Sequence, residues 1–295
     1  MLFGAALKGN LCHPYNRRRR FDAAMRYLEW KIRCAMGRPW DKRFWGDRLV
    51  TLFPDSSESM WLLYNVVMDW PEFPFLESYL RRNDTVIDIG ANIGVYALWM
   101  SRFLGPEGKL IAFEPSSQSF ARLAGQMRQN GLDAVVLEKK AVADRAGRVR
   151  LTRDKDMENR VLHETEPALS SEMVEAVTLD QYLQASSIAQ VDFLKIDVEG
   201  AEPMAIDGAD SALRDRRIAV IQFEVGEHWH RYGRDLAATA DKLSGFGYTP
   251  FAPDDSGKAL WRVGDWGASV RGQNLFVTRS VREVSERLGS SSSRD

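Results

Sequence analysis

A glycine-punctuated turn and a later acidic residue have the spacing of a nucleoside-binding site. The turn is Asp88-Ile89-Gly90-Ala91-Asn92-Ile93-Gly94, and Glu114 lies about 20 residues beyond it. A carboxylate at this spacing can accept hydrogen bonds from both hydroxyls of a ribose. Gly90 and Gly94 have no Cβ atom, so we expect a ligand to approach the backbone there.

The acid that opens this turn narrows the choice of ligand. Asp88 would repel a pyrophosphate, whereas it suits a cationic group. The turn also lacks the G-x-G-x-x-G pattern of dinucleotide sites and the G-K-[ST] of a P-loop. S-adenosyl-L-methionine carries a sulfonium and an ammonium group and no phosphate, so the turn favours it as the cofactor. The alternative is an ordinary turn followed by a chance glutamate.

Charged residues also lie at or just beyond the ends of two later apolar runs, 191–196 and 218–225. In chain order they are Lys195, Asp197, Glu199, Glu224 and His228. Acids at the mouth of a central strand are costly to bury unless they accept a proton, bind a metal or hold a cation. Asp197 and Glu199 are two residues apart, so we expect them on the same face of an alternating strand. These residues are therefore candidates for a reaction centre.

Alternating strands and helices must position these groups. Thr85 to Ile89 predicts a buried strand, Val95 to Phe103 a helix, and Lys109 to Phe113 a second strand that ends at Glu114. Further strands are expected over 134–137, 191–196, 218–225, 248–251 and 274–278, with helices over 117–130, from 179, from 201 and over 234–245. Ser116 and Thr178 are the expected helix caps. In a doubly wound sheet of this kind, the carboxyl ends of the strands share one crevice.

Two stretches between these elements lead to separate expectations. Ala143 and Asp144 close the third strand–helix connection, where Asp144 could accept from an adenine amino group or could be an ordinary loop aspartate. Residues 153–173 are polar and contain His163, so we expect an insertion or lid rather than a core element.

The N-terminal region differs in charge from the rest of the chain. Residues 1–50 carry 12 Lys and Arg against 4 Asp and Glu, a net charge of +8, while the remaining residues carry −9. Arg17-Arg18-Arg19-Arg20 could contact anionic lipid or nucleic acid, or could be a solvated helix entry. The following residues have helical spacing over 21–36. We expect residues 1–69 to form a cap over one side of the crevice or an oligomer contact.

The remaining composition limits location and cofactors. Cys12 and Cys34 form no disulfide framework and no zinc motif, so a reducing cytoplasm is expected. The sequence has no run of 18 apolar residues, and residues 1–7 lack the pattern of a signal peptide. We therefore expect a cytoplasmic protein, with peripheral membrane contact through Arg17 to Arg20 as an option. The Ser-rich end, 289–295, is expected to be disordered.

The motifs DTVIDIGANIGVYAL, AFEPSSQSFARL, AVAD, VTLDQYL, VDFLKIDVEGAE and IQFEV, in this order, resemble the FkbM-type family of S-adenosylmethionine-dependent methyltransferases. The resemblance covers roughly residues 70–280. It implies an α/β, Rossmann-like sheet of seven strands, mostly parallel with an antiparallel last strand, to which the N-terminal region adds a helical cap. It also implies methylation of a hydroxyl of a sugar, glycolipid, polysaccharide or natural product. The expected domains are the basic cap 1–69, the methyltransferase domain 70–280 and a tail 281–295.

Transfer of an activated methyl group to a hydroxyl needs in-line positioning and removal of a proton. The candidate bases, by position, are Asp197, Glu199, Glu224 and His228. Lys195 would orient a carboxylate or polarise the acceptor, unless it is structural, and both His163 and His228 could be surface residues. The chain has four histidines, so no metal site is expected, although a carboxylate site stays open. The expected cofactor-binding residues are Asp88, Gly90, Ala91, Asn92, Gly94, Glu114, Pro115, Ala143, Asp144 and Asp197.

Three functions therefore stay open. The first is O-methylation of a small-molecule or glycan acceptor, without nucleic acid. The second is RNA methylation, motivated by the basic N-terminal region, although no Asn-Pro-Pro-Tyr-type element of base N-methylation occurs. The third is a cofactor-binding scaffold that has lost catalysis, against which the acids after two strands argue.

Overall fold

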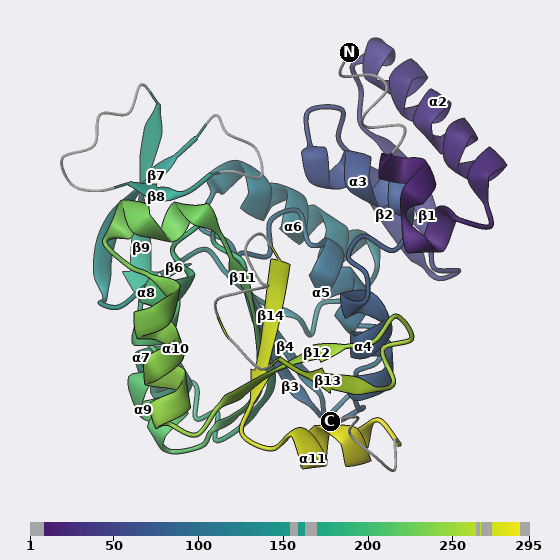
Figure 1. Cartoon of the computed structure of the whole chain (residues 1–295). Helices are drawn as coiled ribbons and strands as arrows, with labels where there is room; N and C mark the ends of the chain where they lie inside the picture. Colours follow the sequence, from purple (N-terminus) through teal and green to yellow (C-terminus); the bar gives the residue numbers. More distant parts are fainter. Residues whose placement is uncertain (1–8, 154–158, 163–169, 264–265, 267–272, 290–295) are drawn as a thin grey trace.

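The computed structural model describes residues 9–153, 159–162, 170–263, 266 and 273–289 (Figure 1). Its centre is an eight-stranded sheet with the order β13-β12-β14-β11-β10-β3-β4-β5. The strands are β3 (Thr85–Ile89), β4 (Lys109–Phe113), β5 (Val136–Glu138), β10 (Val191–Ile196), β11 (Ile218–Val225), β12 (Thr249–Pro253), β13 (Leu260–Arg262) and β14 (Gln273–Thr278).

The strand directions confirm a mostly parallel sheet whose last strand is antiparallel. β5, β4, β3, β10 and β11 pair in parallel, whereas β14 runs antiparallel to both β11 and β12. The strand count is one higher than predicted, because β13 pairs antiparallel with β12 at the sheet edge. This three-residue strand, Leu260–Arg262, is too short to leave a clear periodic signal in the sequence.

Helices cover both faces of the sheet (Figure 1). One face carries α4 (Glu72–Tyr79), α5 (Val95–Met100), α6 (Ser117–Gln129) and α11 (Val281–Arg287). The other face carries α7 (Leu179–Ala185), α8 (Glu202–Asp207), α9 (Asp210–Arg214) and α10 (Leu236–Gly245). Neighbouring strand residues point into opposite cores: Val86 joins the first and Ile87 the second. The sheet is thus buried on both sides, which explains its continuous apolar strands.

The two expected helix caps are confirmed by their hydrogen bonds. The side chain of Ser116 accepts from the backbone N–H of Ser119 at the start of α6, and Thr178 accepts from Gln181 at the start of α7. Each satisfies one of the N–H groups that a first helical turn leaves unpaired. Helix α5 ends at Met100, three residues before the predicted end.

A second, four-stranded sheet flanks the carboxyl edge of the first. Its order is β6-β9-β7-β8, formed by β6 (Ala141–Val142), β7 (Gly147–Thr152), β8 (Val161–Leu162) and β9 (Ser171–Val177). The stretch 153–173, expected to be an insertion or lid, contributes β8 and the start of β9 to this second sheet. His163 and the other residues of 154–158 and 163–169 lie outside the described residues.

The N-terminal cap comprises η1 (Pro14–Asn16), α2 (Arg20–Met36), the hairpin β1 (Trp40–Phe44) and β2 (Arg48–Leu52), and α3 (Ser57–Asn65). The helix predicted over 21–36 is confirmed, but the cap is not purely helical. Charged residues between the aromatic side chains obscured the hairpin, whose turn has positive φ at Trp45 and Gly46. The side chain of Gln126 on α6 bonds both the N–H and the C=O of Thr51, which fixes the cap to the body.

The C-terminal segment is partly ordered. Residues 281–287 form α11 rather than a tail, because Arg287 binds the carbonyl of Tyr79 and the carboxylates of Asp84 and Asp192. Residues 290–295 lie outside the described part. None of the helices within the described residues is long and apolar enough to cross a membrane.

Candidate active site

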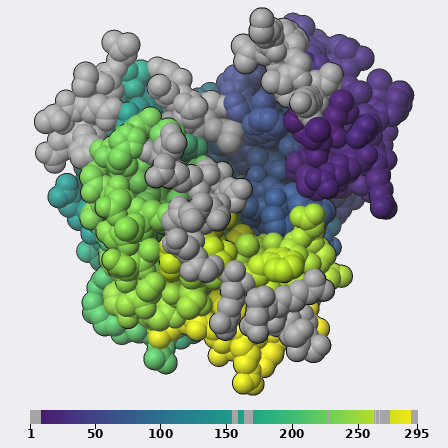
Figure 2. All heavy atoms as spheres, viewed as in Figure 1, coloured from purple at the N-terminus to yellow at the C-terminus, as the bar shows by residue number. Residues whose placement is uncertain are grey.

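A large pocket opens at the carboxyl ends of β3, β4, β10 and β11. Its volume is about 1130 Å³, and the cap, the second sheet and the loop after β12 complete its wall. In the space-filling view the cap forms a separate lobe beside the body (Figure 2). The predicted residues that line the pocket are Asp88, Gly90, Ala91, Asn92, Glu114, Pro115, Lys195, Asp197, Glu199 and Glu224.

The two glycines of the turn have a structural role that the sequence did not indicate. A Cβ on Gly90 would lie 1.8 Å from the backbone oxygen of Asp197, and one on Gly94 would lie 2.6 Å from Leu123 Cδ1. Both glycines also have positive φ. They therefore permit close packing of the turn against the protein itself, and Gly94 does not line the pocket.

Substituting Gly90 is thus expected to damage the fold, not only ligand binding. Gly90→Ala should lower the free energy of unfolding by about 3 kcal/mol or more, because the clash is with rigid backbone and the φ is strained. Gly125→Ala is the matched control, since a Cβ there meets nothing within 4 Å. Chemical denaturation of both variants measures the difference, and equal stability would contradict this role for Gly90.

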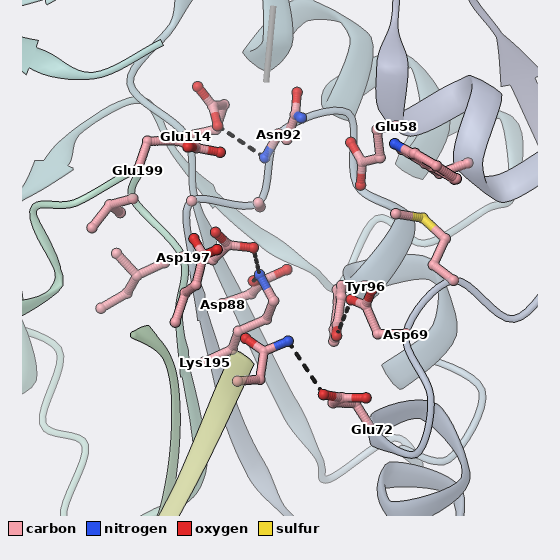
Figure 3. Close-up of a pocket in the computed structure, with 18 of the residues that line it drawn as sticks. Glu58, Asp69, Glu72, Asp88, Asn92, Tyr96, Glu114, Lys195, Asp197 and Glu199 are labelled. Carbon is pink, nitrogen blue, oxygen red and sulfur yellow. Dashed lines mark hydrogen bonds and ion pairs between the residues drawn. The ribbon is translucent and has the colours of Figure 1, made fainter. Parts of the chain in front are cut away.

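Glu114 is held in place by the turn. Its Oε1 accepts from the backbone N–H of Ser116 at 2.8 Å, and its Oε2 accepts from that of Asn92 at 2.9 Å (Figure 3). Burial raises the pKa of Glu114 to about 7, although these two donors oppose the shift. Each oxygen has a further lone pair that can accept a hydrogen bond, and Glu114 lines the pocket. The carboxylate therefore fits the ribose hydroxyls of S-adenosylmethionine.

Asp88 and Asp197 flank the ammonium of Lys195 (Figure 3). Lys195 Nζ lies 2.8 Å from Asp197 Oδ2 and 3.8 Å from Asp88 Oδ1, and 4.4 Å from the ring centre of Tyr96. Burial alone would lower the pKa of Lys195, but the neighbouring acids outweigh burial and raise it. Lys195 is therefore a fixed cation that holds Asp197 in position.

Asp88 itself is fully buried, and neither of its oxygens has a hydrogen-bond partner among the described residues. Burial raises its pKa to about 6, while the charge of Lys195 opposes the shift. A buried carboxylate without donors favours a further cation. The sulfonium and ammonium groups of S-adenosylmethionine match this requirement, so the residues present fit the expected cofactor.

The carboxylates of Asp197, Glu202 and Glu224 offer oxygens within 4.8 Å of one another. Glu202, however, accepts from the N–H groups of Val198 and Gly200 and from the indole of Trp229. Its oxygens are used to shape the turn after β10, and Asp197 already pairs with Lys195. The geometry thus favours a carboxylate pair, Asp197 and Glu224, over a metal centre.

The argument that placed Glu199 beside Asp197 on one strand face is wrong. β10 ends at Ile196, so both residues lie in the following turn, where Glu199 has a φ of +55° and Gly200 a φ of +104°. Strand alternation therefore says nothing about the direction of Glu199. Glu199 does line the pocket, because it belongs to a turn whose backbone N–H groups donate to the carboxylate of Glu202.

Three other predicted residues lie outside the pocket wall. Asp144 pairs with Arg234 at 3.5 Å, and the backbone oxygen of Ala143 packs against Gly208. His228 is exposed in a short 3₁₀ helix. The pocket is lined instead by residues 140–142, directly before the predicted pair. The prediction that these three residues contact a ligand is therefore not supported by their positions.

Sequence reasoning missed a group of acids contributed by the cap and α4. They are Glu58, Asp69 and Glu72, and all three line the pocket (Figure 3). Glu58 accepts from the N–H of Ile93 at 3.2 Å, and Asp69 accepts from the hydroxyl of Tyr96 at 2.5 Å. No local motif marks these acids, because only tertiary packing brings them to the crevice.

The buried acids predict how stability depends on pH. Burial raises the pKa of Glu58 to about 8 and those of Glu72 and Glu202 to about 7, from 4.5. The folded state thus keeps protons that the unfolded chain loses, so this stabilisation is complete below about pH 4.5 and is lost up to about pH 8. Denaturant titrations of the ligand-free protein should show this decline. Glu58→Gln should make it shallower, whereas an unchanged slope would contradict the shift at Glu58.

The sequence matches the profile of the family described as "Methyltransferase FkbM domain" over residues 88–250. Methyltransferase sdnD of Sordaria araneosa is 27% identical over 162 residues, which cover 44% of this chain and 62% of that protein. Methyltransferase 1 of Beauveria bassiana is 26% identical over 145 residues, covering 42% and 58%. The solved METTL16 MTase domain aligns at 14% identity and a TM-score of 0.47, covering 91% of this chain and 96% of that one.

The alignments span about three fifths of the length of the two curated relatives. The profile match covers more than half of this chain and includes Asp88, Glu114, Asp197 and Glu224, the acids at the ends of four neighbouring strands. This chain belongs to the FkbM family of S-adenosylmethionine-dependent methyltransferases.

Proposed function

We propose that the protein transfers a methyl group from S-adenosylmethionine to a hydroxyl of an acceptor without net negative charge, such as a neutral sugar or a hydroxylated natural product. The observation that carries this proposal is the charge of the pocket wall. Ten carboxyl groups line the pocket, against the cations Lys140, Arg160 and Lys195. Burial keeps part of these acids protonated near neutral pH, as at Glu58, but the acids still outnumber the cations. Such a wall repels phosphate and sulfate, whereas phosphate contacts in nucleic-acid sites come largely from Lys and Arg.

Unpaired polar groups on the cap side support a hydroxyl-rich acceptor. Glu72 Oε2, Trp70 Nε1 and His13 Nδ1 are buried, have no partner among the described residues, and belong to side chains that line the pocket. The indole needs an acceptor and the glutamate oxygen suits a donor. A hydroxyl group can serve either one, because it both donates and accepts. A polyol would therefore satisfy several of these groups at once.

The residues at the strand ends have distinct roles in this reaction. S-adenosylmethionine, when bound, supplies an electrophilic methyl group. Glu114 would hold its ribose, and Asp88 would face its positive charges. Asp197 or Glu224 would take the hydroxyl proton, and burial, which raises the pKa of Glu224, makes that carboxylate a stronger base. Lys195 would keep Asp197 aimed at the acceptor.

Methyl-labelled S-adenosylmethionine distinguishes the candidate functions. The protein is incubated with neutral oligosaccharides, with sulfated forms of the same oligosaccharides, and with RNA. Label in the neutral pool, with little in its sulfated counterpart, is the expected result. Label in RNA would favour the nucleic-acid alternative. Cofactor binding by calorimetry without transfer to any pool would favour a non-catalytic scaffold.

A further inference from the structure

Helix α2 exposes a continuous apolar stripe. The side chains of its outer face and their exposed fractions are Phe21 (77%), Met25 (47%), Leu28 (49%), Ile32 (55%) and Met36 (60%). Their spacing of three and four residues places them on one side of the helix. The opposite side packs on the cap through the buried residues Ala23 and Trp30. Monomeric proteins rarely leave so ordered a stripe uncovered.

Cations adjoin this stripe. Arg17, Arg18, Arg19 and Arg20 are all exposed at the start of α2, and Lys31 is exposed between Leu28 and Ile32. Helix α2 has two acids: Glu29 is paired with Lys42, and Asp22 is exposed in the first turn beside the four arginines. The first 50 residues carry +8 and the rest of the chain −9. An anionic surface would attract the cap and repel the body. The protein would therefore approach such a surface with the cap, which carries α2, facing it.

We propose that α2 docks in the plane of an anionic lipid bilayer. The helix has 17 residues, about 25 Å in length, and its second apolar side is buried against the cap, so it suits the interface rather than the bilayer interior. The stripe would enter the boundary between headgroups and acyl chains, and the arginines would bind lipid phosphates. Figure 1 shows α2 at the outer edge of the cap, away from the sheet, so a flat surface can reach it.

Two other occupants suit this face less well. A second copy would bring two strongly basic caps together across a symmetry axis, where like charges repel. Nucleic acid would meet the arginines but would leave the aliphatic side chains in water. The bilayer is the partner that satisfies both the stripe and its charges. This inference is independent of the acceptor of methyl transfer.

Cosedimentation of the full chain with vesicles tests the proposal. We expect binding to phosphatidylcholine vesicles that contain phosphatidylglycerol, and much weaker binding to phosphatidylcholine alone. Added salt should weaken the association, because exposed charges are screened over about 8 Å at physiological ionic strength. The variant Leu28→Ser/Ile32→Ser should lower the partition coefficient by about 100-fold through lost apolar burial. Val136→Ser/Met173→Ser is the matched control, since both residues are exposed apolar side chains outside α2.

Absence of binding by the native chain to anionic vesicles would overturn the proposal, as would unchanged binding of the α2 variant. Circular dichroism should show the same unfolding temperature for this variant as for the native chain, because both substituted side chains are exposed. Sedimentation velocity addresses the second copy. A native dimer that the α2 substitutions dissociate would assign the stripe to self-association and overturn membrane docking, whereas a monomer supports it.

Discussion

Replacing Asp197 by Asn or Glu224 by Gln is expected to reduce methyl transfer by about 10²- to 10⁴-fold, the usual cost of losing a general base. The two carboxylates extend from neighbouring strands into the same pocket and lie close together. Asp197→Asn would also remove the negative charge that pairs with the Lys195 ammonium at 2.8 Å. Affinity for S-adenosylmethionine should change far less than turnover.

The measurement is turnover and cofactor affinity of each variant across a pH series. In the native enzyme the rate should rise with pH as the base loses its proton, and the variant that lacks the base should lose this inflection. Glu138→Gln, an acid at the end of β5 outside the pocket wall, is the control. Near-native turnover in both variants would place the base elsewhere in the pocket.

Replacing Glu114 is expected to weaken S-adenosylmethionine binding by about 10- to 100-fold, equivalent to roughly 1.5–3 kcal/mol for a charged hydrogen bond. Glu114→Gln keeps the shape and one acceptor oxygen but removes the charge and the second acceptor. Calorimetry gives the affinity, and thermal unfolding shows whether the turn that depends on Asn92 and Ser116 survives. A folded variant with native affinity would contradict the ribose assignment.

The parts of the fold that could be predicted are those with local signals. Thr85–Ile89 and Lys109–Phe113 were predicted with the observed bounds, because apolar β-branched runs and flanking turn residues mark both ends. The crevice at the carboxyl ends followed from parallel topology. Glu114, at the end of its strand, was therefore placed correctly at the pocket from sequence alone.

The rest depends on contacts between distant segments. Glu58 reaches the pocket only because the cap packs over the turn at Ile93, which is 35 residues away in sequence. From sequence alone, Asp144 could bind adenine or be a loop aspartate, and His228 could be a base or a surface residue. In the structure Asp144 pairs with Arg234, and His228 is exposed. Acidic residues in loops have no period, so a pattern cannot say which of them face a ligand.

The hydrogen bond between Glu58 and Ile93 also shows which residues a functional fragment of this protein must include. The family profile matches residues 88–250, but the pocket wall runs from His13 to Phe276. A fragment trimmed to the matched region would keep the cofactor turn and lose the acids of the cap, the bond that Glu58 makes to the turn, and strand β14. Boundaries chosen from the profile match would thus divide the pocket wall, and Glu58, Asp69 and Glu72 would be left out.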